Sequence, residues 1–142
     1  MTSESSPSLS HIYLIALAYN LVIIPFSKVF SSNLGSVDPL FSPSGCFLIL
    51  LWGVAYASVC KVYRQVPILS AVFAVEKLFY GLRWIVWMND NYGALMDITR
   101  DDALTGLFFS IYGIGDLAFA VFFFYSAACY WDGIKMDEKR TN

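Results

Sequence analysis

Hydrophobic residues occur in four long runs along the chain, separated by short polar or proline-containing segments. The runs cover about residues 11–30, 43–63, 67–88 and 103–131. An α-helix needs about 20 apolar residues to cross the hydrocarbon core of a bilayer. The runs lack the alternation of barrel strands, and only helices and closed barrels satisfy their backbone hydrogen bonds in lipid. The pattern therefore predicts an all-α integral membrane protein, a bundle of four transmembrane helices.

Prolines and short polar residues mark the ends of these helices. Pro25 lacks the amide that a regular helix needs, so we expect a kink or an end there. Ser42, followed by a proline, is a typical N-cap, and Pro67 opens the third helix. Asp101 and Asp102 close an acidic loop before the fourth run, where negative charge favours a helix N-terminus. The fourth run exceeds one crossing, which predicts a tilted or projecting helix.

The chain ends and the basic residues predict the topology. We expect residues 1–10 to be a disordered polar tail and residues 132–142 to be a cytoplasmic tail. Four spans put both termini and the turn between the second and third helices on one side. Cytoplasmic loops carry an excess of Lys and Arg, which predicts cytoplasmic termini and a multi-pass protein of the cell inner or plasma membrane. The basic residues on the side of the termini are Lys61, Arg64, Lys135, Lys139 and Arg140, against Lys28 and Arg100 on the other.

Composition agrees with a single membrane bundle and excludes several function classes. Hydrophobic residues make up 58% and charged residues 14% of the chain, whereas soluble domains carry about 25% charged residues. A net charge of −2 argues against nucleic acid as a partner. One histidine, three cysteines without a CxxC and no glycine-rich phosphate loop argue against a metal or nucleotide site. We therefore expect no cofactor.

Glu76 and Lys77 lie in the middle of the third helix, and Asp116 lies in the fourth. A charge at the bilayer centre costs roughly 3 kcal/mol on insertion scales, so such residues are usually paired and face inward. At 1.5 Å per residue, both acids lie about 18–20 Å from the outer helix ends, at mid-membrane depth. At 100° per residue, Tyr80 and Arg83 share the face of Glu76. We expect Lys77 to pair with Asp116 and Arg83 with Glu76, unless Arg83 instead extends outward to the membrane surface.

The inward faces of all four helices contribute to this polar centre, while the opposite faces of the third and fourth helices are apolar and predict contact with lipid. Aromatic walls around a few polar groups are typical of small-molecule pockets. We take no residue as catalytic and none as a metal ligand. The candidate ligand-binding or proton-linked residues are Glu76, Lys77, Asp116, Tyr80, Tyr112, Arg83, Asn20, Tyr56 and Trp84.

Several functions fit this centre. The first is a non-enzymatic protein that binds a small hydrophobic or amphipathic ligand, or serves a larger membrane complex. The second is a proton-coupled transporter of small cations, acting as a homo-oligomer. The third is a membrane enzyme on a lipid or sterol-like substrate, with Glu76 as its acid–base group. The fourth is a structural subunit, because Glu76, Asp116, Lys77 and Arg83 sum to zero charge.

The architecture resembles two families in outline. Small multidrug-resistance transporters also have four short helices and one membrane glutamate, but theirs lies in the first helix. The emopamil-binding and sterol-isomerase superfamily is similar in holding membrane acids inside an aromatic bundle. These resemblances imply a transporter or a sterol-binding bundle, and assign no role to any residue of this chain.

Overall fold

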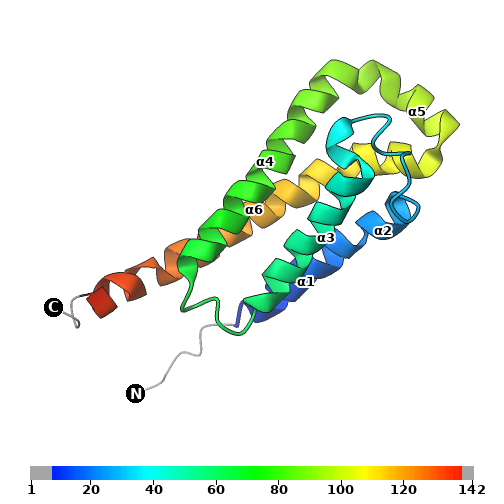
Figure 1. Cartoon of the computed structure of the whole chain (residues 1–142). Coiled ribbons are helices and arrows are strands. Elements are labelled where there is room, and N and C mark those ends of the chain that lie inside the picture. Colours follow the sequence, from blue (N-terminus) through cyan, green and yellow to red (C-terminus); the bar gives the residue numbers. More distant parts are fainter. Residues whose placement is uncertain (1–7, 139–142) are drawn as a thin grey trace.

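The computed structural model describes the backbone of residues 8–138 and the side chains of residues 8–132. Within this part of the chain the secondary structure is helical, without a strand, which confirms the all-α prediction. The long helices are α1 (Ser10–Leu21) with its short continuation α2 (Ile23–Phe26), α3 (Pro43–Ser58), α4 (Pro67–Asn91) and α6 (Ala103–Glu138) (Figure 1). Short helical turns connect them: η1 (Pro39–Phe41), η2 (Tyr92–Ala94) and α5 (Leu95–Asp101).

The helix ends follow the local signals in the sequence. Helix α1 stops at Leu21 and α2 ends one residue after Pro25, because the proline ring and its missing amide interrupt the regular hydrogen bonds. The Ser42 side chain caps α3 by accepting a hydrogen bond from the Gly45 amide at 3.2 Å. Asp102 accepts one from the Leu104 amide at 3.1 Å and so caps α6.

Other boundaries differ from the prediction. Helix α3 ends at Ser58, and residues 59–65 form turns, although the hydrophobic run continues to residue 63. Helix α4 extends to Asn91, and the expected acidic loop is mostly the turn η2 and helix α5. Residues 132–138 continue α6, so this helix runs past the end predicted for the fourth run, and whether this part is cytoplasmic stays a prediction. Most of the predicted N-terminal tail, residues 1–7, and residues 139–142 lie outside the described part of the chain.

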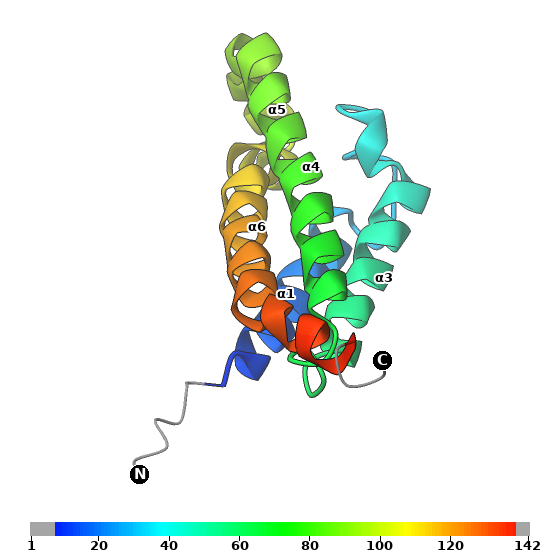
Figure 2. The same ribbon diagram turned by 90° about the vertical axis from the view of Figure 1, so that its left-hand side faces the viewer.

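The helices pack as two antiparallel pairs. Helix α4 lies along α6, and α1 lies along α3 (Figures 1 and 2). The α3–α4 turn lies at one end of the molecule, and α5 with the segment before α3 lies at the other (Figure 1). Gly113 allows the close contact of α4 with α6, because a Cβ atom there would lie 2.1 Å from the Trp84 side chain. Gly113 therefore has a packing role in this pair of helices.

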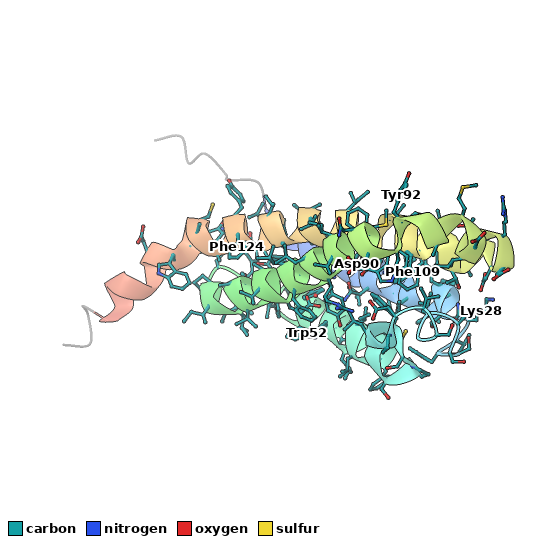
Figure 3. All side chains as sticks on the ribbon, turned by 90° about the horizontal axis from the view of Figure 1, so that it is seen from above. Lys28, Trp52, Asp90, Tyr92, Phe109 and Phe124 are labelled. Carbon is teal, nitrogen blue, oxygen red and sulfur yellow. The ribbon has the colours of Figure 1, made fainter. Side chains whose placement is uncertain are left out.

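Two aromatic clusters form the core, one toward each end of the bundle. The cluster toward α5 is centred on Phe41, which contacts the rings of Phe109 and Tyr112. The cluster toward the α3–α4 turn joins Tyr56 to Phe123. Phe109 lies between the helices, whereas the exposed Tyr92 points away from the bundle (Figure 3).

One helix within residues 8–138 is long and apolar enough to cross a membrane by length and composition, namely Ala103–Asp132 of α6. The helices Ser10–Phe26 and Pro43–Ser58 are apolar but shorter. Helix α4 is long enough, but Glu76, Lys77 and Arg83 lie within it. The structure thus supports a weak expectation of membrane association, and the four-span arrangement remains a prediction.

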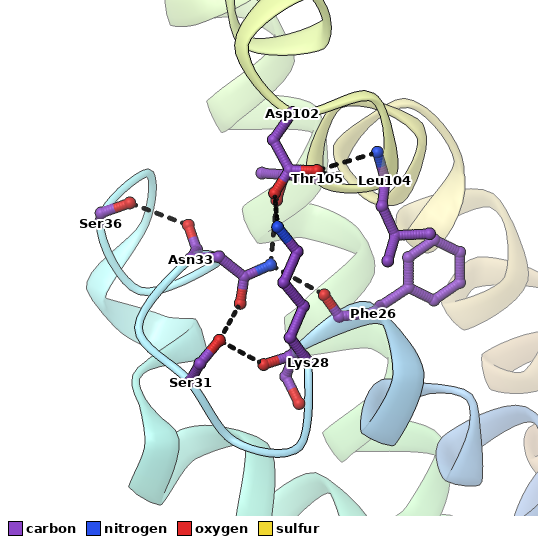
Figure 4. Close-up of polar contacts among 9 residues, drawn as sticks. Phe26, Lys28, Ser31, Asn33, Ser36, Asp102, Leu104 and Thr105 are labelled. Atoms are coloured by element: carbon purple, nitrogen blue, oxygen red, sulfur yellow. Dashed lines mark hydrogen bonds and ion pairs between the residues drawn. The ribbon is translucent and has the colours of Figure 1, made fainter.

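A polar cluster joins the end of α2 to the start of α6, and we call it the outer clamp: Lys28, Asn33, Asp102 and Thr105 (Figure 4). The Asn33 amide donates to the Phe26 carbonyl at 2.9 Å and to the Thr105 hydroxyl at 3.0 Å. The Lys28 ammonium contacts the Asp102 carboxylate at 2.6 Å. These contacts fix the chain just after α2 against the α6 N-terminus.

The backbone inside the outer clamp is strained. Lys28, Val29 and Phe30 have φ angles of 50°, 60° and 61°. This left-handed region costs an L-residue roughly 1–2 kcal/mol, and a β-branched valine is rare there. The clamp contacts and a hydrogen bond from the Phe30 amide to the Ser27 hydroxyl at 3.0 Å hold this turn in place.

Candidate functional site

A layer of polar side chains separates the two aromatic clusters, and we call it the polar layer. On α4, Phe73 belongs to one cluster and Tyr80 to the other, with the charged pair between them. On α6, Tyr112 and Phe123 enclose the layer in the same way. The layer consists of Asn20 from α1, Tyr56 from α3, Glu76 and Lys77 from α4, and Asp116 from α6.

Lys77 is the centre of the polar layer. Its ammonium donates to Asp116 Oδ1 at 2.8 Å, which is the pairing that the sequence predicts. A second hydrogen bond goes to Asn20 Oδ1 at 2.7 Å, and the Asn20 amide in turn donates to the Ile49 carbonyl at 2.8 Å. The side chains of Lys77 and Asp116 are only 2% and 7% exposed. The pair is therefore largely removed from solvent, and the ammonium uses two of its three N–H donors on Asp116 and Asn20.

Aromatic rings complete the surroundings of the Lys77 ammonium. The nitrogen lies 5.0 Å from the ring centroid of Tyr19 and 5.4 Å from that of Tyr56. Cations within about 6 Å of a ring face gain electrostatic attraction from the ring. The layer therefore already holds one ammonium by a carboxylate, an amide oxygen and two aromatic rings.

The predicted pairing of Arg83 with Glu76 is wrong. Arg83 contacts Asp38, with its Nη2 atom 3.0 and 3.1 Å from the two carboxylate oxygens. Asp38 is 2% exposed and also caps η1 by accepting from the Leu40 amide at 3.0 Å. The helical periodicity could not show this, because Asp38 lies in the irregular segment between α2 and α3. Its position before Pro39 is nevertheless an N-cap signature that the sequence contains.

Glu76 is consequently left without an ion-pair partner among the described side chains. Its carboxylate accepts a hydrogen bond from the Tyr56 hydroxyl on α3. With Arg83 neutralised by Asp38, the layer contains two carboxylates and one ammonium. The four charges that sum to zero in the sequence therefore do not share one site, and the layer itself is neutral only when one of its two carboxyl groups is protonated.

A cavity of about 90 Å³ lies beside the polar layer. Glu76, Lys77 and Asp116 line it, and the rest of its wall is aromatic or aliphatic. Two lining residues are also exposed on the outside of the bundle, Val22 at 42% and Ile111 at 46%. The cavity therefore opens sideways, between the α1–α2 segment and α6.

The structure brings seven of the nine candidate residues to this site. Tyr80 and Tyr112 line the cavity together with Asn20 and the charged residues, and Tyr56 contacts Glu76 from α3. Trp84 lies elsewhere, with its indole nitrogen donating to the Phe109 carbonyl at 2.8 Å. Arg83, which is 43% exposed, also lies outside the cavity. No ligand tests the predicted roles of these residues, which stay predictions.

Tyr19 is a site residue that the sequence reasoning missed. Its ring faces Lys77, it lines the cavity, and its hydroxyl donates to the backbone carbonyl of Tyr112. The signal was its position next to Asn20, since neighbours on a helix are only about 100° apart. The hydroxyl of Tyr112 is buried and has no hydrogen-bond partner among the described residues.

Among the side chains of residues 8–132, no three His, Cys, Asp or Glu residues come close enough together to hold a metal ion. The chemistry that the described residues offer is hydrogen bonding, charge pairing and proton exchange. Comparisons with protein-family models, with curated proteins and with solved structures find no match for this chain.

Proposed function

We propose that this chain is a four-span membrane protein that binds the polar headgroup of a small amphipathic molecule in the cavity beside the polar layer. Both termini would face the cytoplasm. The observation that carries the proposal is the cavity itself, which the charged residues line at the middle of the bundle. A purely structural ion pair is stable when packed solid and needs no open space beside it.

The exposed faces of the helices support a lipid environment. Large apolar side chains are solvent-accessible on every long helix, and extensive exposed apolar surface is typical of a membrane or protein contact. On α4 and α6 they include the residues that the sequence assigns to lipid. Examples are Ile15 on α1, Leu51 and Val54 on α3, Val75, Phe79 and Val86 on α4, and Leu107, Ile114 and Val121 on α6.

The short helices are compatible with a bilayer because residues 27–42, which lie next to them, form backbone hydrogen bonds within their own segment. Helix α3 spans only about 24 Å at 1.5 Å per residue, so part of residues 27–42 would lie near the membrane surface. Irregular backbone is tolerated there only when its polar groups are bonded. The Ser31 amide donates to the Ser27 carbonyl at 2.8 Å and the Asp38 amide to the Leu34 carbonyl at 3.0 Å.

The size and shape of the cavity limit the ligand. A dry cavity of about 150 Å³ admits one benzene molecule, so about 90 Å³ admits only a headgroup. The sideways opening at Val22 and Ile111 would let an apolar tail remain in the lipid. An enclosed sterol nucleus would not fit, which disfavours the enzyme on a sterol-like substrate.

Proton-coupled transport is the second candidate function, and the unpaired Glu76 favours it. A buried carboxylate without a counter-ion exchanges protons when its surroundings change. Four helices enclose little space, so such a transporter would act as an oligomer. Transport would require the same site to open to both sides, whereas binding requires only the lateral opening.

Filling the lateral opening tests the proposed function. Ile111→Trp places a large ring at the opening, and Ile114→Trp is the matched control at an exposed position that does not line the cavity. Alkyl amphipaths with different headgroups would be titrated into the protein in phosphatidylcholine nanodiscs, with binding followed by tryptophan fluorescence in parallel with thermal stability. We expect Ile111→Trp to weaken binding by tenfold or more (about 1.4 kcal/mol) and Ile114→Trp to leave it unchanged. Equal binding by both variants, or binding of no amphipath to the wild type, would refute the proposal.

A further inference from the structure

The charge of the polar layer narrows the class of ligand, and this step rests on the ligand-binding function proposed above. Lys77 is committed to Asp116 and Asn20, with distances of 2.8 and 2.7 Å. The other cation expected at the centre, Arg83, is bound to Asp38 at 3.0 Å. Glu76 therefore remains as one carboxylate without a matching cation on the cavity wall.

We propose that the cavity binds a cationic headgroup, an alkylammonium, and that this headgroup replaces a proton on Glu76. In the empty site Glu76 is protonated, because a carboxylate that is partly removed from water and has no counter-ion is costly. On binding, the Glu76 carboxylic acid loses its proton to solvent, and the resulting carboxylate pairs with the incoming ammonium. One positive charge leaves and one arrives, so the charge of the layer stays constant.

The aromatic wall fits an ammonium. Tyr19, Tyr80 and Tyr112 line the cavity together with Phe41 and Phe108. The layer already contains one ammonium held in this manner, since Lys77 lies over the ring of Tyr19 at 5.0 Å. A ligand ammonium beside Glu76 would receive the same two kinds of contact, a carboxylate and ring faces.

Other headgroups fit the site less well. An anionic headgroup would meet Asp116 and Glu76, while the cation that could attract it, Lys77, is already paired. A neutral hydroxyl could occupy the cavity, but it would leave Glu76 protonated, so no proton would be released on binding. A cation therefore matches both the shape and the charge of the wall.

The groups that face Glu76 identify it as the one that exchanges. Tyr56 on α3 donates a hydrogen bond to it, and the same cavity wall holds Tyr19 from α1, Lys77 and Tyr80 from α4, and Asp116 from α6. The tyrosines are neutral at ordinary pH, and the pair of Lys77 with Asp116 is held by direct contact. Only Glu76 can change its charge without breaking an ion pair.

The test uses alkyl chains of equal length that end in an amine, an alcohol or a sulfate, added to the full-length protein in phosphatidylcholine nanodiscs. We expect the amine to bind most tightly. In the pH range where Glu76 is protonated in the free protein, the affinity for the amine should rise by about tenfold per pH unit, because binding releases a proton. A pH-sensitive dye in weak buffer should record about one proton released per amine bound. The alcohol should bind weakly and release none.

Glu76→Gln keeps the shape of the side chain and removes the exchangeable charge. We expect this variant to bind the amine about a hundredfold more weakly and with no pH dependence. Asp97→Asn, which removes one exposed negative charge at the far end of the molecule, is the matched control and should bind like the wild type. Gel filtration and thermal unfolding would show that both variants are folded.

The outcomes separate the two proposals. If the alcohol binds as tightly as the amine and no proton is released by the wild type, the cationic class is wrong while the binding function stands. If no amphipath binds at any pH, both proposals fail. The proton-release measurement uses wild-type protein, so it decides the question even if Glu76→Gln does not fold.

Discussion

Two lysine–aspartate pairs in this molecule have similar geometry and very different surroundings. In the polar layer, Lys77 and Asp116 are 2.8 Å apart, with side-chain exposures of 2% and 7%. In the outer clamp, Lys28 and Asp102 are 2.6 Å apart, with exposures of 50% and 26%. The shorter distance belongs to the more exposed pair, so distance alone does not rank the two contacts.

The difference between the pairs shows that burial determines how much an ion pair contributes to stability. Water competes for the outer pair, which therefore contributes little energy and serves to position the turn after α2. The inner pair has little access to water, so each partner depends on the other. The inner pair keeps a charged group at the cavity wall, and the outer pair holds a strained loop closed.

Removing one partner of the inner pair should give the largest effect. Lys77→Met leaves Asp116 buried without its cation, and we expect the free energy of unfolding to fall by about 3–5 kcal/mol. Equilibrium unfolding in detergent would measure this change. The double variant Lys77→Met/Asp116→Leu should recover most of the lost stability, because it leaves no buried charge without a counter-ion. Lys61→Met, at an exposed lysine without an ion pair among the described residues, is the control. If the single and double variants unfold alike, burial does not control the value of this pair.

A third pair sharpens the comparison, because it has one buried and one exposed partner. Asp38 is 2% exposed and Arg83 is 43% exposed. Arg83→Gln should lower the free energy of unfolding by about 1–3 kcal/mol, since Asp38 keeps its backbone hydrogen bond but loses its cation. The same unfolding experiment applies, with Arg100→Gln at the exposed pair with Asp97 as control. If Arg83→Gln lowered the free energy of unfolding as much as Lys77→Met does, the proposed ranking of the ion pairs by burial would be wrong.

The outer clamp should give the smallest effect, and it should depend on pH. Hydrogen bonds from Lys28 and then from Thr105 lower the pKa of Asp102 from 3.8 to about 2. A lowered folded-state pKa means that the stabilisation is complete above pH 4 and disappears as the pH falls toward 2. Limited proteolysis of residues 27–38 should therefore accelerate between those values. The Lys28→Met variant should be cleaved faster than the wild type at neutral pH, and its cleavage rate should lose most of the pH dependence. An unchanged cleavage rate would mean that the pair does not hold the turn.

The sequence determined the helices and their faces by itself, because both follow from local rules. Proline and capping residues set most helix starts. The rise per residue placed Glu76 and Asp116 at similar depth, and the period of 3.6 residues placed them on inward faces. The same period predicted the exposed apolar faces of α4 and α6. Where local signals were weak, as at the end of α3, the hydrophobic run overestimated the helix.

Only the tertiary structure decided which charges meet. Arg83 shares a helix face with Glu76, yet it binds Asp38, which arrives from an irregular segment that no periodicity describes. Glu76 loses its expected cation for that reason, and the neighbouring cavity is formed by residues from several separate parts of the chain. A periodic pattern fixes the direction of a side chain on its own helix. Which residue of another helix or loop that side chain contacts depends on how all the helices and their connections pack together.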